Sequence, residues 1–326
     1  MVGQLMSGME WERHGLTFPI LKLDRPSWMH SHAQAPWAQK MDGHIRIFFS
    51  TRQRPDSGNQ SISRLAFADF DLQERFELRN ISHSPVLELG TRGMFDEFGT
   101  YPMSTVEVGS EIWGYYGGWT RTKSVPFNVQ IGLAVSLDGG ETFERRGRGG
   151  PILSFSSEEP FIISGPKIKK FGSRFYLFYI AGRSWITDNG KPEPVYRIRL
   201  ATSDDGLNWE KLNRDLISPC SGVEAQASPD VFWWNGRYNM LFSHRPGRNF
   251  REPGNGYRLG YAWSKDLFTW SRDDEFVNFP ILDGEFDTGM QAYPHFFELN
   301  NRQFMAYLGN DFGRFGFGIA ELKGAS

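Results

Sequence analysis

The sequence lacks the features that mark membrane proteins and disulfide-stabilised proteins. Its 326 residues include a single cysteine, Cys220, so no internal disulfide can form, which is typical of a reducing compartment. No apolar run approaches the length of a bilayer span. The first residues, MVGQLMSGMEWERHG, have neither the basic region nor the apolar run of a signal peptide. We therefore expect a cytoplasmic location and no membrane partner.

An excess of charge of either sign is also missing. The chain has 36 Lys and Arg against 38 Asp and Glu, for a net charge of -2. This excludes the broadly basic surface of many nucleic-acid-binding proteins, and we expect no nucleic-acid partner. No long segment has a helical period, while the 39% hydrophobic and 15% aromatic residues suffice for a large core.

What the sequence does contain is a repeat of about 65 residues. Each copy has an X-Pro pair, then alternating strand residues, a turn and an aromatic-rich strand, as in SGPKIKKFGSRFYLFYIAG. A third strand and a turn follow, as in QIGLAVSLDGGETFE. The five pairs are Ala35-Pro36, Tyr101-Pro102, Gly165-Pro166, Ser228-Pro229 and Tyr293-Pro294. Alternation with period two indicates antiparallel strands, and four strands per repeat predict a five-bladed β-propeller.

The fifth repeat has no fourth strand of its own. It runs out at FGFGIAELKGAS, whereas WERHGLTFPIL at residues 11–21 matches FERRGRGGPIL at residues 143–153. We infer that the N-terminal segment supplies the outer strand of the last blade, which protects an open edge. The prediction is an all-β fold over residues 1–326: one domain of five four-stranded antiparallel blades, with the ring closed by the N-terminal strand.

This architecture places the loops after the second strands around one mouth of the central channel. The loops at residues 51–61, 117–128, 181–195, 244–256 and 309–316 hold ten Lys or Arg against five Asp or Glu. Arginine binds carboxylate or phosphate with two parallel hydrogen bonds. Arg52, Arg183 and Arg245 are therefore candidates for binding an anion. The alternative is that they are solvated or pair with neighbouring carboxylates.

Polar side chains also occupy the starts of the predicted inner strands, where apolar packing would be ordinary. Glu97 and Glu224 each lie five residues before a proline, so we place them in equivalent positions. The candidates at the strand starts and second-strand ends are His32, Gln34, Asp96, Glu97, Tyr101, Trp119, Glu224, Gln226, Asp230, His244, Asp287, Gln291 and Tyr293. A polar ligand explains them, and the alternative is that they bind one another and channel water. His30 and His32 are too few to predict a metal, and we predict no metal or cofactor.

Over essentially the whole chain, the repeats resemble the five-bladed propeller glycosidases, the group that includes arabinanases, xylosidases, invertases and levansucrases. The resemblance rests on SGPKIKKFGSRFYLFYIAG, SPDVFWWNGRYNMLFSHR and ATSDDGLNWE. It implies carboxylates in base, orienting and acid roles at the inner-strand starts of the first three blades. Those positions hold Ala35, Met103 and Ser164 here, while the fourth blade keeps a Pro-Asp pair with Asp230.

Two functions are therefore open. The first is a glycosidase or related glycosyl-transferring enzyme, with Glu224 as general acid and Asp96 or Glu97 as base or nucleophile. A basic mouth would suit an acidic or nucleotide-linked sugar, in polysaccharide metabolism. The second is a propeller that binds a sugar or other anion without catalysis, with Tyr101, Trp119 and Trp185 as faces for a ring. Both predict a small-molecule or oligosaccharide ligand, anionic in character.

Overall fold

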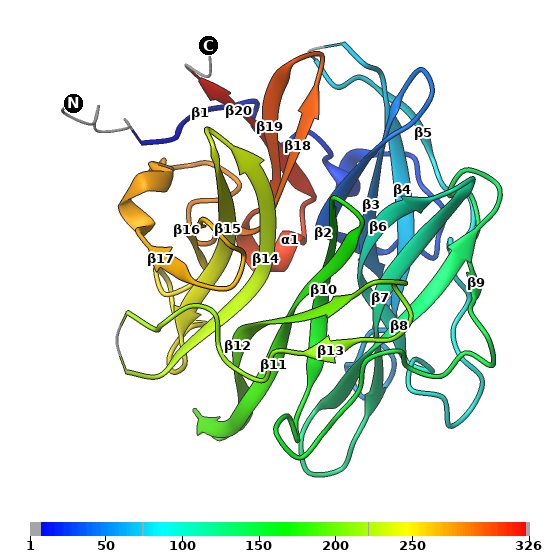
Figure 1. Cartoon of the computed structure of the whole chain (residues 1–326). Helices are drawn as coiled ribbons and strands as arrows, with labels where there is room; N and C mark the ends of the chain where they lie inside the picture. The colour runs from blue at the N-terminus through cyan, green and yellow to red at the C-terminus, as the bar shows by residue number, and fades with distance from the viewer. Residues whose placement is uncertain (1–7, 74, 221, 324–326) are drawn as a thin grey trace.

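The computed structural model describes residues 8–73, 75–220 and 222–323, and these form an almost entirely β structure (Figure 1). The described helical segments are short: η1 (Ile20–Lys22), η2 (Asp274–Val277) and α1 (Asn310–Gly313). None of them is long and apolar enough to cross a membrane. The prediction of an all-β fold is confirmed. The expectation about the first residues of the chain concerns, in part, residues 1–7, which lie outside the described residues.

Each of the first four sequence repeats forms four antiparallel strands. The first repeat forms β2 (Ser31–Lys40), β3 (Ile45–Arg52), β4 (Ser63–Phe70) and β5 (Leu78–Ile81). The second forms β6 (Gly99–Val108), β7 (Glu111–Arg121), β8 (Phe127–Ser136) and β9 (Glu144–Arg145). The third forms β10 (Ile163–Phe171), β11 (Arg174–Asp188), β12 (Lys191–Ser203) and β13 (Glu210–Lys211). The fourth forms β14 (Glu224–Trp234), β15 (Arg237–Pro246), β16 (Arg258–Ser264) and β17 (Trp270–Arg272). A parallel pairing of Ser63 with Gly99 joins the first two groups into an eight-stranded sheet.

The last sheet combines the two ends of the chain. It contains β18 (Ala292–Leu299), β19 (Arg302–Leu308), β20 (Phe317–Lys323) and β1 (Glu10–Arg13). β1 pairs antiparallel with β20, with Trp11 opposite Leu322, and the two strands lie side by side in Figure 1. The pairing predicted for the N-terminal segment is therefore present. The regular strand covers only the start of residues 11–21, and an isolated bridge from Phe18 to Phe317 follows it.

The X-Pro pairs lie at an irregularity in each first strand. The pairing register between first and second strands shifts across every pair, as between Ala227 and Asp230. In four repeats the residue before proline has a φ between 50° and 61°: Ala35, Gly165, Ser228 and Tyr293. Proline cannot donate a ladder hydrogen bond, and a β-bulge accommodates that loss. The repeated pair therefore encodes a bulge at the start of each first strand.

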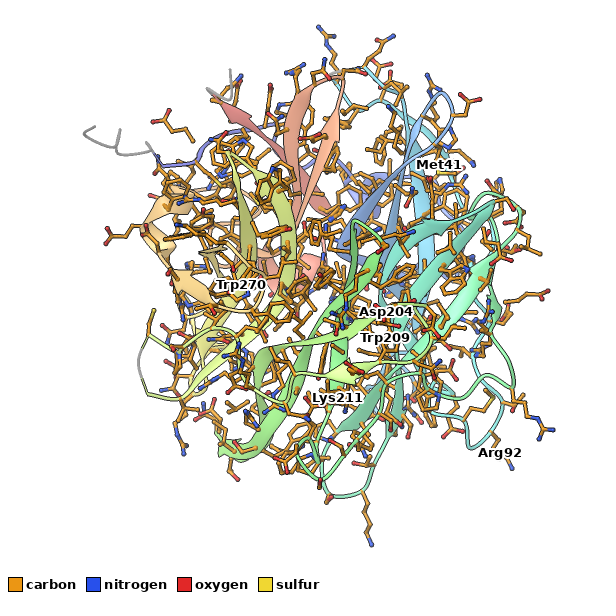
Figure 2. All side chains as sticks on the ribbon, viewed as in Figure 1. Met41, Arg92, Asp204, Trp209, Lys211 and Trp270 are labelled. Carbon is orange, nitrogen blue, oxygen red and sulfur yellow. The ribbon has the colours of Figure 1, made fainter. Side chains whose placement is uncertain are left out.

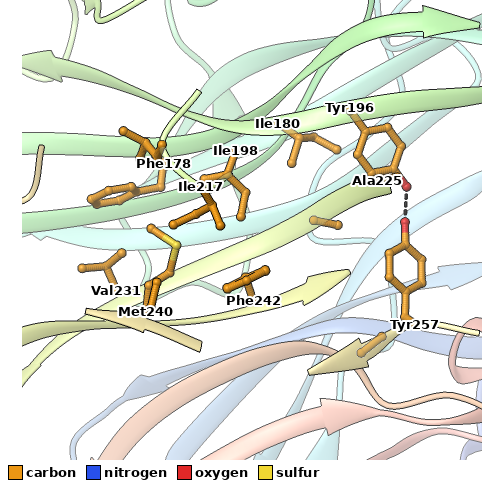
Figure 3. Close-up of a cluster of buried hydrophobic side chains, with 14 of the residues drawn as sticks. Phe178, Ile180, Tyr196, Ile198, Ile217, Ala225, Val231, Met240, Phe242 and Tyr257 are labelled. Carbon is orange, nitrogen blue, oxygen red and sulfur yellow. Dashed lines mark hydrogen bonds between the residues drawn. The ribbon is translucent and has the colours of Figure 1, made fainter. Parts of the chain in front are cut away.

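The hydrophobic core lies between neighbouring sheets. Phe178 and Ile198 of the third repeat pack in one cluster with Val231 and Phe242 of the fourth (Figure 3). Burying a large apolar side chain stabilises the fold by roughly 1.5–3 kcal/mol. Contacts between first strands follow the order β2, β6, β10, β14 and β18, and β18 also contacts β2. The short fourth strands β9 and β17 lie at opposite edges of the molecule (Figure 1).

Buried ion pairs attach the outer strands in the second and third repeats. Asp96 is completely buried and accepts hydrogen bonds from Tyr116 on β7, at 2.9 Å, and from Arg145 Nε on β9, at 2.8 Å. Glu159 is also completely buried. It accepts from Tyr179 on β11 at 2.7 Å, and Lys211 Nζ on β13 lies 2.5 Å from it (Figure 2). A buried carboxylate is stable only when it is paired in this way.

We predict that Glu159→Gln lowers the free energy of unfolding by about 1–3 kcal/mol, because it removes the counter-charge of the partly buried Lys211 and one of the two acids paired with the buried Arg199, which keeps Asp215. Urea denaturation measures this loss. The exposed neighbour Glu158 gives the matched control, and Glu158→Gln should change stability by less than about 0.5 kcal/mol. Equal, small effects of both substitutions would contradict the structural role of the ion pair.

Candidate ligand-binding site

Four tyrosines and two arginines meet at the end of the molecule where the first strands begin, which we call the mouth. Tyr101 and Tyr293 have ring centroids 6.5 Å apart, and Tyr293 and Tyr257 have centroids 5.6 Å apart. The hydroxyls of Tyr257 and Tyr196 are hydrogen-bonded (Figure 3). Every repeat contributes to this tyrosine–arginine cluster, which consists of Arg52, Tyr101, Tyr196, Arg245, Tyr257 and Tyr293.

Arg245 is a buried cation beside this row of rings. It is 2% exposed, and its Cζ lies 5.5 Å from the ring centroids of both Tyr196 and Tyr257. Its Nη1 and Nη2 donate to the carbonyl oxygens of Pro246 and Pro194, each at 3.0 Å, while Nε has no hydrogen-bond partner. Within the described residues, no carboxylate forms an ion pair with Arg245. Its Cζ also lies 3.6 Å from the ring centroid of Phe250, so its charge is compensated by neutral oxygens and aromatic rings and not by an opposite charge, which leaves a site that an anion would stabilise.

Arg52 lies at the other end of the row, next to Tyr101 and Tyr293. It is partly exposed, and its Nε donates to Gln34 Oε1 at 3.2 Å. Burial lowers the pKa of Arg52, and the two tyrosines oppose that shift. Arg52 also forms no ion pair with a carboxylate of the described chain. The predicted candidates Arg52 and Arg245 thus both lie in the cluster without counter-charges.

Arg183 does not share this environment. Its Nη2 donates to Asp215 Oδ1 at 2.5 Å, so its charge is already compensated. The structure thus favours the alternative considered for it, pairing with a neighbouring carboxylate.

His32 adds a neutral polar group next to Arg52. Burial, Arg52 and Arg314 lower the pKa of His32 to about 3, so the ring is uncharged at neutral pH. Its Nδ1 lies 2.7 Å from Ser31 Oγ. The cationic neighbours disfavour a metal at this position. Among the residues that the structure describes, no group of three or more His, Cys, Asp and Glu is arranged to bind a metal ion.

Glu224 belongs to a polar network at the start of β14. Its side chain accepts hydrogen bonds from Arg272 Nη1 and Gln226 Nε2, each at 2.8 Å, and from the backbone N–H of Cys220 at 3.2 Å. Both carboxylate oxygens therefore act as acceptors. A general acid must instead donate a proton to the leaving group. The role predicted for Glu224 stays a prediction, and its contacts do not favour it.

Glu224, Asp96 and Asp287 occupy equivalent positions, because each lies 20 residues before a partner on the second strand. The same spacing joins Glu159 to Tyr179. The second-strand partner of Asp96 is Tyr116, that of Glu224 is His244, and that of Asp287 is Tyr307. In each of these repeats the fourth strand supplies a cation that pairs with the acid. For Asp287 this cation is Arg13 of β1, whose Nε lies 3.7 Å from the carboxylate. The equivalence of Glu97 with Glu224 is therefore corrected, since Asp96 is the counterpart of Glu224.

His244 makes the fourth repeat different from the others. Its side chain is 24% exposed, with Nδ1 3.8 Å from Glu224 and Nε2 3.5 Å from Asp274. Burial lowers the pKa of His244, and Arg272 and Arg258 contribute to the shift. Tyr116 and Tyr179, in contrast, are almost fully buried, and each uses its hydroxyl to bind the acid. The fourth repeat thus has a partly open, titratable group at a position that is buried and structural elsewhere.

Asp230 lies within the first strands rather than in the cluster. It is completely buried, and Lys169 Nζ lies 2.9 Å from it. The backbone N–H of Phe296 donates to it at 2.6 Å, and His295 Nδ1 lies at 3.3 Å. Burial alone would raise the pKa of Asp230, but Lys169, His295 and Lys167 lower it. Asp230 therefore links β10, β14 and β18, which explains a polar residue there without a ligand.

The remaining predicted residues also have partners within the protein. Gln226 and Gln291 are at most 1% exposed and donate to backbone carbonyls. Trp119 Nε1 donates to Ser63 Oγ at 2.6 Å. Glu97 is partly exposed and accepts a hydrogen bond from the backbone N–H of Gly93 at 2.8 Å. These contacts place the four residues near the strand starts but outside the tyrosine–arginine cluster.

Sequence reasoning missed Tyr196 and Tyr257. A Tyr-Arg pair occurs at the start of the third strand in two repeats, at Tyr196-Arg197 and at Tyr257-Arg258. This recurrence in the sequence could have identified the two tyrosines as equivalent residues. The juxtaposition of Tyr257 with Tyr293, in contrast, depends on the packing of β16 against β18.

We predict that stability falls as the pH decreases from 6.5 towards 3, in part because of His32. In the folded state its pKa is about 3, whereas the unfolded chain binds a proton near pH 6.5. His32→Asn, which tolerates the φ of 69° at this residue, should remove that contribution. Between pH 7 and 4.5 the wild type should lose roughly 1 kcal/mol more than the variant, a value reduced for partial exposure. Urea denaturation of both proteins at each pH tests this, and a constant difference would contradict it.

Sequence comparisons with known proteins identify relatives over nearly the whole chain. The chain matches no protein-family model. It is 33% identical over 318 residues to the uncharacterized proteins MT1551 and Rv1502 of Mycobacterium tuberculosis, covering 97% of this chain and 100% of each relative.

Several solved structures have the same architecture. One, described as a glycoside hydrolase, has a TM-score of 0.74 at 15% identity and covers 98% of this chain and 93% of its own. Another belongs to a study of GH130 mannoside phosphorylases and glycoside hydrolases that target β-1,2 mannosidic linkages in Candida mannan. It has a TM-score of 0.70 at 16% identity, over 98% of this chain and 95% of its own. The β-fructofuranosidase BmSUC1 of Bombyx mori has a TM-score of 0.62 at 19% identity, over 90% and 62% of the two chains. The predicted resemblance to propeller glycosidases is confirmed at the level of fold.

Proposed function

The chain belongs to the family of the mycobacterial proteins MT1551 and Rv1502, and we propose that it binds an acidic or nucleotide-linked sugar at the mouth of a five-bladed β-propeller. The five groups of four strands, the pairing of β1 with β20 and the contact of β18 with β2 support a single closed domain over residues 1–326. A cytoplasmic location, where nucleotide-linked sugars are made, is part of this proposal.

One observation carries the proposal. Arg52 and Arg245 lie at the mouth without carboxylate partners in the described chain, next to tyrosine rings. A guanidinium group can bind a carboxylate or phosphate through two parallel hydrogen bonds. Tyrosine rings offer an apolar face to the C–H groups of a sugar and a hydroxyl for its oxygens. An anionic sugar uses both properties, whereas a neutral sugar would leave the cations uncompensated.

The carboxylates support binding over hydrolysis. Two-carboxylate glycoside cleavage needs an acid that donates and a second carboxylate that activates water or attacks. Asp96 and Asp287 are completely buried, and Glu224 is 5% exposed and accepts three hydrogen bonds. We therefore propose that the protein binds its sugar without cleaving it by the mechanism predicted for Glu224 and Asp96.

A glycosidase or glycosyl-transferring function is the second candidate. The similarity in fold to glycoside hydrolases favours it. So does the fourth repeat, where Glu224 has a partly exposed His244 and Asp274 as neighbours. Glu224 with its partner His244 would then be the centre of proton transfer, in polysaccharide metabolism.

We predict that Arg52→Gln weakens the binding of an acidic sugar at least tenfold, since it removes a charge-assisted hydrogen bond pair. Calorimetric titration with methyl glucuronide, glucose 1-phosphate, UDP-glucose and neutral methyl glucoside measures it. Arg92→Gln is the control, because Arg92 is exposed and lies outside the cluster (Figure 2). Binding of methyl glucoside as tight as that of the acidic sugars would overturn the anionic character of the ligand.

Mass spectrometry separates the two candidate functions. After long incubation with pooled neutral glycosides, uronides and nucleotide sugars, we expect that the wild type leaves every compound unchanged while an acidic one raises the melting temperature. A product formed by the wild type and not by Glu224→Gln would instead establish the second candidate.

A further inference from the structure

A pocket of about 320 Å³ lies next to the fourth repeat, in which His244 takes the position that a buried tyrosine has in other repeats. Its polar wall includes Arg258, Asp274 and Gln291, and its apolar wall includes Leu259, Phe279 and Ile281. These residues come from β16, from η2 and the segment that follows it, and from the residues just before β18. The pocket is thus bounded by the fourth repeat and by the start of the last sheet.

The pocket adjoins the tyrosine–arginine cluster through the backbone. Arg258 directly follows Tyr257, and Gln291 lies two residues before Tyr293. Successive Cα atoms are about 3.8 Å apart, so cluster residues and pocket residues lie within a few ångströms along two separate strands. The backbone N–H of Gln291 also donates to the carbonyl of Tyr257 at 2.9 Å, which fixes these two segments together. The pocket and the cluster are therefore built on two shared backbone segments.

The charges of the pocket differ from those of the cluster. Asp274 lines it and is held by Arg272, whose Nη2 donates at 2.7 Å, and the exposed Glu275 also lines it. Arg258 also lines the pocket, so the pocket carries charges of both signs and, unlike the cluster, does not select an anionic group. His244 is 24% exposed and lies 3.5 Å from Asp274, whereas the tyrosine hydroxyls at the same position in the second and third repeats are bonded to buried acids. The fourth repeat therefore combines an apolar wall with polar groups suited to hydroxyls.

We infer that this pocket is a subsite for a neutral sugar unit linked to the acidic unit on the cluster, so that the ligand is an oligosaccharide or a longer glycoside. The inference rests on the proposed function and extends it. The C–H face of the neutral unit packs on Leu259 and Ile281, and its hydroxyls meet Arg258 and Asp274. A concave site with apolar walls and a few converging polar groups has this kind of specificity.

The test compares ligands that differ by one neutral unit. Methyl glucuronide is paired with the same uronide carrying one glucose, and glucose 1-phosphate is paired with maltose 1-phosphate. In calorimetric titrations, the wild type should bind the longer member of at least one pair tenfold or more tightly. Ile281→Trp fills the pocket from a side chain that is 47% exposed, and it should abolish that gain while leaving the affinity for the single acidic sugar unchanged.

Leu282→Trp is the matched control, because Leu282 is 46% exposed and does not line the pocket. It should keep the gain. Equal affinities for both members of each pair in the wild type, or loss of the gain in both variants, would overturn the subsite while leaving the proposed function intact. If none of the acidic probes binds the wild type, the proposed function fails and the subsite fails with it.

Discussion

A charge removed from water must be compensated by a nearby opposite charge or by hydrogen bonds, and the polar interior of this protein follows that constraint. Asp96 and Glu159 are completely buried, and each has a tyrosine hydroxyl and a cation from the outer strand as partners. Asp230 is buried with Lys169 and a backbone N–H. The acids are thereby committed to the fold. The cations of the mouth are not, since Arg52 and Arg245 have no carboxylate partner in the described chain. This asymmetry separates structural carboxylates from available cations, and it is the basis for proposing an anionic ligand.

The repeats supply an internal control for this distinction. An acid and a second-strand partner 20 residues later occur in four of them, and the partner is a tyrosine in three. Where the arrangement is buried and saturated, as in the second and third repeats, it connects inner and outer strands. In the fourth repeat the partner is His244, which is partly exposed beside Asp274 and next to a pocket. A single change of residue type thus converts a structural position into a polar surface that a ligand can reach.

Much of the fold could be predicted from the sequence because strand alternation, turn residues and X-Pro pairs are local signals. The match of residues 11–21 with residues 143–153 also indicated the partner of the last strand. The equivalence of the acids could not be read correctly by counting from proline. That distance is five residues for Glu224, six for Asp96 and seven for Glu159, while the distance to the second-strand partner stays at 20. The row of tyrosines could not be predicted either, because Tyr101, Tyr257 and Tyr293 meet only through packing between repeats.

The most direct test of the central claim is a crystal structure of the protein with the acidic sugar that raises its melting temperature most. The account predicts an intact sugar at the mouth, with its carboxylate or phosphate on Arg52 or Arg245 and its ring against Tyr101 or Tyr293. An acidic group bound elsewhere, or a cleaved sugar next to Glu224, would contradict it.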